Sequence, residues 1–85
     1  MPEICRFLGI VIYVYSKDHN PPHFHFVYGE FEGIMYIKEL IVEGKVPTKI
    51  IKHLTKWSEL HKIELLRIWD LAQKGKPLPK VEPLK

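Results

Sequence analysis

The hydrophobic period of the chain changes at Pro47, and this change constrains the fold more than any other feature. Before Pro47 the apolar residues are largely β-branched and aromatic, and parts of these runs alternate with polar residues, as in half-buried strands. After it, Ile50, Leu54 and Trp57 recur at helical spacing, and neither glycine nor proline interrupts the pattern before Gly75. The sequence therefore predicts an α+β fold in which the sheet precedes the helices.

Residues 4–43 are expected to form a small antiparallel sheet of four or five strands. The runs between glycines, prolines and polar turns place the strands at 4–8, 10–15, 23–28, 31–37 and 40–43. Gly29 and Glu30 are typical of a hairpin turn. Because short connections join antiparallel neighbours, the strands should follow one another in sequence order.

Residues 48–74 are expected to be helical, either as one long helix or as two consecutive helices. A straight helix would bring His61 onto the apolar stripe, whereas the apolar residue at this point is Leu60. The stripe therefore shifts, which favours two helices at 48–60 and 62–74.

Length and composition are those of a single domain spanning residues 1–85. The 46% hydrophobic content is ordinary for a folded protein. The last ten residues hold three prolines and should form an extended tail. Cys5 has no cysteine partner, and no apolar run is long enough for a signal peptide or a membrane span. A cytoplasmic location without a membrane partner is expected.

Charge is unevenly distributed along the chain. Residues 1–46 carry four basic and six acidic side chains, whereas residues 47–85 carry nine basic and four acidic ones. The basic side chains on the polar flank of the first helix are Lys49, Lys52, His53 and Lys56. This stripe could bind the phosphates of RNA or DNA, although a solvated helix surface is the simpler explanation.

The densest group of candidate functional residues is the segment from His19 to His25. Three imidazoles lie within seven residues, on either side of the diproline at 21–22. The prolines cannot donate to a sheet and should hold this loop extended. Strand alternation then places His23 and His25 on the same face, while His19 lies in the preceding loop.

Three interpretations of these histidines are open. His23 and His25 could bind a transition metal such as zinc, with His19 as a third ligand and Asp18 completing the site or orienting a ring. One histidine could instead act as base and another as acid in metal-independent RNA cleavage. The third interpretation is structural, with hydrogen bonds and ring packing only. The spacing is not diagnostic, so the sequence commits to no cofactor.

Three motifs make the chain similar to small bacterial proteins of the domain-of-unknown-function family 4160. They are Pro2-x-Ile4-x-Arg6-Phe7-x-Gly9-Ile10, Asp18-His19-Asn20-Pro21-Pro22-His23-Phe24-His25 with Tyr28-Gly29, and Trp57-x-x-x-x-His61-x-x-Glu64-Leu65-x-x-x-Trp69. The resemblance spans almost the whole chain. It implies a candidate site at His19, His23 and His25. The supporting candidates that it implies are Arg6, Asp18, His61 and Glu64.

The resemblance also bears on function. Genes of this family resemble small paired cassettes, often beside equally small partner proteins, which implies a toxin and antitoxin arrangement. The leading hypothesis is therefore a prokaryotic toxin–antitoxin-like component that binds RNA, DNA or a cognate partner protein and could cleave RNA with its histidines. One alternative is a small transition-metal-binding protein with His19, His23 and His25 as ligands. Another is a non-catalytic interaction module. Homo-oligomerisation and enzymatic activity are both open.

Overall fold

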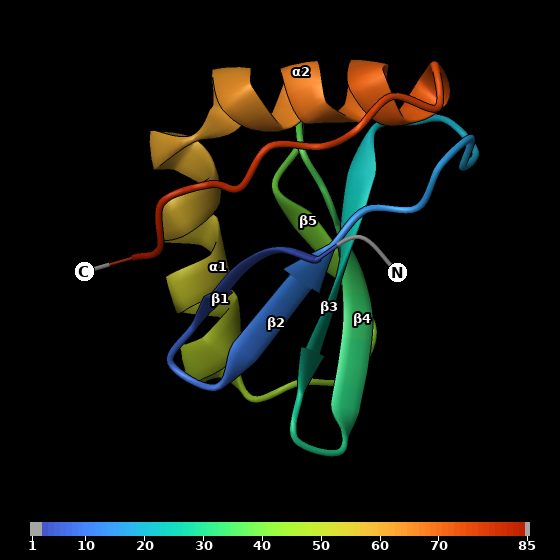
Figure 1. Cartoon of the computed structure of the whole chain (residues 1–85). Coiled ribbons are helices and arrows are strands. Elements are labelled where there is room, and N and C mark those ends of the chain that lie inside the picture. Colours follow the sequence, from blue (N-terminus) through green and yellow to red (C-terminus); the bar gives the residue numbers. More distant parts are fainter. Residues whose placement is uncertain (1–2, 85) are drawn as a thin grey trace.

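The structure, a computed structural model that describes residues 3–84, contains a five-stranded sheet followed by two helices (Figure 1). The strands are β1 (Glu3–Phe7), β2 (Ile10–Tyr13), β3 (His23–Tyr28), β4 (Phe31–Tyr36) and β5 (Ile41–Glu43), and the helices are α1 (Thr48–Leu60) and α2 (Lys62–Gln73). All neighbouring strands are antiparallel and follow the sequence order. The predicted α+β class and the two-helix alternative are confirmed. Pro2, in the N-terminal motif, lies outside the described residues.

A tight turn at Leu8 and Gly9 joins β1 to β2. Both residues have positive φ angles, 48° and 79°. Two-residue turns of this kind match the right-handed twist of the paired strands, and Gly9 adopts the conformation without a steric penalty. Leu8 and Gly9 therefore form a hairpin turn, which brings β2 beside β1.

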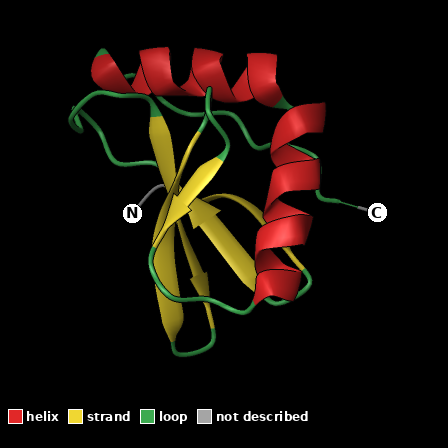
Figure 2. Ribbon diagram, turned by 180° about the vertical axis from the view of Figure 1, so that it is seen from behind, coloured by secondary structure: helices red, strands yellow, loops and turns green. Residues whose placement is uncertain are grey.

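The main core lies between α1 and one face of the sheet. Trp57 of α1 is fully buried, and its ring contacts Phe7 and Phe24 at centroid distances of 5.5 and 5.7 Å. Figure 2 shows α1 running along this face, while α2 lies across one end of the strands. Neither described helix is long and apolar enough to cross a membrane.

Residues 76–84 form neither helix nor strand and pass beside the edge strand β1. The Val81 N–H donates to the Ile4 carbonyl oxygen at 2.8 Å, and the Val81 side chain is buried. Trp57 Nε1–H donates to the Glu82 carbonyl oxygen, also at 2.8 Å. These contacts attach the proline-rich tail to the core and occupy backbone groups at one edge of the sheet.

Strand alternation gives the sheet two different faces. Phe24 and Phe26 of β3 point toward α1 and are fully buried. His23 and His25 alternate with them and therefore belong to the opposite face, where α2 covers His23 with Trp69 at a ring-centroid distance of 5.0 Å. The histidines thus lie on the side of the sheet that α1 leaves uncovered.

Candidate metal centre

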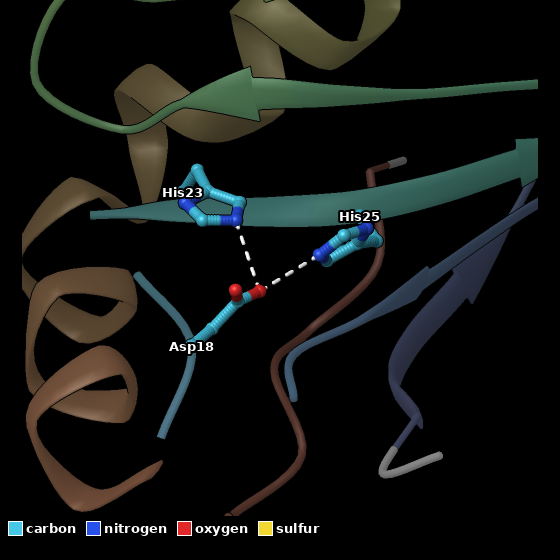
Figure 3. Close-up of side chains that lie close together, drawn as sticks. All are labelled: Asp18, His23 and His25. Atoms are coloured by element: carbon cyan, nitrogen blue, oxygen red, sulfur yellow. Dashed lines mark hydrogen bonds and ion pairs between the residues drawn. The ribbon is translucent and has the colours of Figure 1, made fainter. Parts of the chain in front are cut away.

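The loop before β3 and the first residues of β3 bring three side chains together (Figure 3). Asp18 Oδ2 lies 3.0 Å from His23 Nε2 and 3.0 Å from His25 Nε2. One potential ligand atom from each residue lies within 4.8 Å of the other two, and within residues 3–84 no other group of histidine, cysteine or acidic side chains converges in this way. We call Asp18, His23 and His25 the metal-ligand cluster.

The C-terminal end of α2 fixes the loop that carries Asp18. Lys17 N–H donates to the Ala72 carbonyl oxygen at 3.1 Å, and Gln73 Nε2–H donates to the Asp18 carbonyl oxygen at 3.0 Å. The side chain of Asp18 is also held, because its Oδ1 accepts the His19 backbone N–H at 2.8 Å. Oδ2 is therefore the oxygen that faces the two imidazoles.

His23 is held on both sides of its ring. Nδ1 lies 2.8 Å from the carbonyl oxygen of Pro21, which follows a cis peptide bond. The ring packs against Trp69 at 5.0 Å and Tyr36 at 6.0 Å between centroids. Because a carbonyl oxygen can only accept, Nδ1 carries a proton, and Nε2 is the nitrogen that faces Asp18.

His25 lies on the more accessible side of the cluster. Its ring stacks on Tyr13 at a centroid distance of 5.5 Å with an interplanar angle of 13°, and Tyr15 meets it edge-on at 4.5 Å. The exposed fraction of its side chain is 24%, compared with 8% for His23 and 19% for Asp18. Solvent therefore reaches the cluster more readily beside His25 than beside His23.

The environment of Asp18 favours its ionised form. Burial acts to raise the pKa of this carboxyl, but the hydrogen bond from His25, the His19 amide and the charges of the two imidazoles outweigh it and lower the pKa. The ring of His23 therefore lies between two acceptors, a carbonyl and a carboxylate. It satisfies both as an imidazolium, or its Nε2 lone pair shares a bound cation with Asp18.

The comparison with family models agrees with the resemblance. Residues 9–70 match the model of a domain of unknown function, DUF4160. The chain belongs to this family. No curated protein and no solved structure matches it. The DUF4160 match includes the whole metal-ligand cluster and α1, but the family description assigns them no activity.

The structure gives Asp18, rather than His19, the third position beside the two histidines of this DUF4160 member. His23 and His25 share a face, as strand alternation predicted. His19 is exposed and lies outside the group of converging ligand atoms, and its contact with Asp18 is made by its backbone. From the sequence, Asp18 was expected either to complete a metal site or to orient a ring, and the resemblance implied it only as a supporting residue.

The other supporting candidates lie outside the metal-ligand cluster. Arg6 pairs with Glu3 within β1, with its Nη2 2.8 Å from Glu3 Oε1. His61 lies between α1 and α2, and its Nδ1 is 2.9 Å from Glu64 Oε1. Each is a local pair three residues apart in the sequence.

The basic stripe also lies apart from the cluster. Lys49, Lys52 and Lys56 are exposed, and His53 is half-buried. The inner side of α1 covers the face of the sheet that carries Phe24, so its outer side points away from His25. His23 and His25 therefore do not form one continuous surface with the lysines of α1 on this DUF4160 domain.

Proposed function

We propose that the protein binds one divalent transition-metal ion through Asp18 Oδ2, His23 Nε2 and His25 Nε2. The observation that carries this proposal is the approach of both Nε2 atoms to one carboxylate oxygen, while Nδ1 of His23 is turned to the Pro21 carbonyl. Histidine ligands commonly donate their second ring nitrogen to a carbonyl in this way, which orients the ring. Two imidazoles and one carboxylate suit zinc and ferrous iron.

The separations of the ligand atoms support the same proposal. Two ligands about 2.1 Å from a metal and at right angles to each other lie about 3.0 Å apart. Both Nε2 atoms are 3.0 Å from Asp18 Oδ2. Small side-chain adjustments would therefore be enough to admit an ion.

Three protein ligands leave the metal with open positions. A tetrahedral zinc site keeps one position for water or substrate, and an octahedral site keeps more, whereas structural zinc sites are closed by four protein ligands. The greater exposure of His25 supports access from that side of the cluster. The ion would then be able to bind a further ligand rather than only hold the fold together.

Metal content provides the direct test. The purified, untagged protein is dialysed, and its metals are counted by mass spectrometry and by titration with zinc and with ferrous iron. About one ion per chain is expected in the wild type, and far less in Asp18→Asn and His25→Ala. The matched control is His19→Ala, which removes a neighbouring imidazole outside the cluster and should keep the ion. Equal metal content in all folded variants, or none in any, would refute the proposal.

A second candidate function is binding of nucleic acid within a toxin–antitoxin-like pair, and the exposed lysines of α1 support it. Lysines along one helix can track phosphates. The body of α1, about 10 Å thick, and the sheet separate this stripe from the histidines. Binding of RNA is therefore favoured over its cleavage by His23 and His25.

Salt dependence tests this second candidate. A triple variant, with glutamine at Lys49, Lys52 and Lys56, should lose RNA affinity and lower the slope of log affinity against log salt by about 2 to 3. The control carries glutamine at three exposed lysines elsewhere, Lys38, Lys45 and Lys76, and has the same net charge. An equal loss of RNA affinity in both triple variants would show that net charge alone causes the effect, and would exclude the stripe as a binding site.

A further inference from the structure

A pocket of about 460 Å³ lies beside the metal-ligand cluster. The side chains that shape it include Tyr13, Tyr15, Glu32 and Glu43, together with His25. His25 is the residue that the pocket shares with the cluster. The volume is within the range of small-molecule sites. A ligand in this pocket would therefore touch the accessible side of the proposed metal centre.

Two carboxylates make the pocket acidic. Glu43 of β5 is paired with Ile34 of β4, and Glu32 lies two residues before Ile34, so both glutamates point to the same face. Diagonal neighbours of this kind lie roughly 7 to 8 Å apart, a gap that a small cation can bridge. Within residues 3–84, neither glutamate has an ion-pair partner, and no lysine or arginine lines the pocket.

The aromatic residues complete the chemistry of the pocket. Tyr13 and Tyr15 meet edge to face at a centroid distance of 5.4 Å, and both contact the ring of His25. Aromatic faces attract ammonium and guanidinium groups, and carboxylates pair with them directly. An anion such as a phosphate would instead meet two like charges.

We propose that this pocket binds an organic cation, an ammonium or guanidinium group on an unbranched carbon chain. The cationic group lies between Glu32 and Glu43, and the chain lies along Tyr13 and Tyr15. The pocket binds this cation without a metal. The proposal is therefore independent of the proposed metal site.

The test uses the full chain after chelator treatment, so that its outcome is independent of metal binding. Butylammonium and butylguanidinium are titrated while amide chemical shifts are followed by NMR, with butanol and butyrate as neutral and anionic probes of similar length. Both cations should shift the pocket residues and bind at least fivefold more tightly than butanol. Equal binding of butanol, or preferential binding of butyrate, would overturn the proposal.

Charge variants locate the cation. Glu32→Gln and Glu43→Gln should each weaken butylammonium binding at least fivefold. The matched control is Glu30→Gln, which removes the same charge from the exposed turn between β3 and β4 and should leave the affinity unchanged. An equal effect of all three substitutions would overturn the assignment, because the attraction would then be general.

The source of the cation is decided by a second pair of probes. Spermidine represents free amines, and a capped Gly-Arg-Gly peptide represents side chains of a partner protein. The probe that binds more tightly identifies the source, and failure of both to bind would overturn the proposal. If the metal proposal fails, metal uptake is absent while cation binding persists, so the two failures are distinguishable.

Discussion

Gln73 in the last turn of α2 donates its side-chain amide to the Asp18 carbonyl oxygen at 3.0 Å, although 55 positions separate the two residues in the sequence. The N–H of Lys17 makes a second bond to α2, at Ala72. The loop that presents the carboxylate is therefore held by a helix at the other end of the chain. The geometry of the metal-ligand cluster depends on the docking of α2.

Substitution of Gln73 by alanine should loosen this loop. We expect zinc affinity to fall about tenfold, the lower end of what outer contacts of a metal site contribute, and the free energy of unfolding to fall by about 1 kcal/mol. Zinc titration calorimetry and urea unfolding measure the two effects. Lys74→Ala, which removes only an exposed ion pair with Asp70, is the control. Unchanged zinc affinity in Gln73→Ala would show that the loop holds Asp18 without α2.

The two histidines should differ in their contribution to stability. His23 is buried, packs on Trp69 and bonds at both ring nitrogens, so His23→Ala should lower the unfolding free energy of the metal-free protein by about 2 kcal/mol. His25 is more exposed, and His25→Ala should cost less than about 1 kcal/mol. Urea unfolding in the presence of a chelator measures both. The reverse order would contradict the packing of the two rings.

Alkaline pH should destabilise the protein through Cys5. Burial is the main cause that raises the pKa of this thiol. A group whose pKa is raised on folding contributes stability that is fully present below its unfolded pKa, about 8.5, and is lost as pH rises through the folded pKa. The unfolding free energy should therefore fall more between pH 8 and about pH 10 in the wild type than in Cys5→Ala.

Thiol labelling provides an independent check of the same burial. The Cys5 thiol should react slowly with a thiol reagent in the native protein and at the rate of a free thiol in denaturant. Equal labelling rates in both conditions would mean that β1 opens readily.

Two glycines should respond differently to alanine. A Cβ on Gly33 would lie 2.6 Å from the Glu43 carbonyl oxygen and 2.9 Å from the Phe26 ring. Gly33→Ala should therefore lower the free energy of unfolding by about 2 kcal/mol or more. Gly29 has open space around it but a φ of 58°, so Gly29→Ala should cost only about 1 kcal/mol, the strain of the left-handed conformation. Thermal unfolding compares them, and equal costs would contradict the close approach of β4 and β5.

The sequence by itself determined the order and type of the elements. Alternating and helical periods depend on neighbouring residues alone, so they located the strands and the helical region to within about two residues. They left open four or five strands and one helix or two, although the shift at His61 favoured two. The same alternation placed His23 and His25 on one face. These properties are local, because the direction of a side chain in a strand follows from its position.

Only the tertiary structure decided which side chains meet at the site. Asp18 joins the histidines because α2 docks on its loop, and His19 remains outside because its backbone, not its ring, turns toward that carboxylate. The separation of the α1 lysines from the cluster and the shared pocket of Glu32 and Glu43 arise from layer packing and strand register. Local sequence patterns do not encode such convergence, because it depends on contacts between residues far apart in the chain.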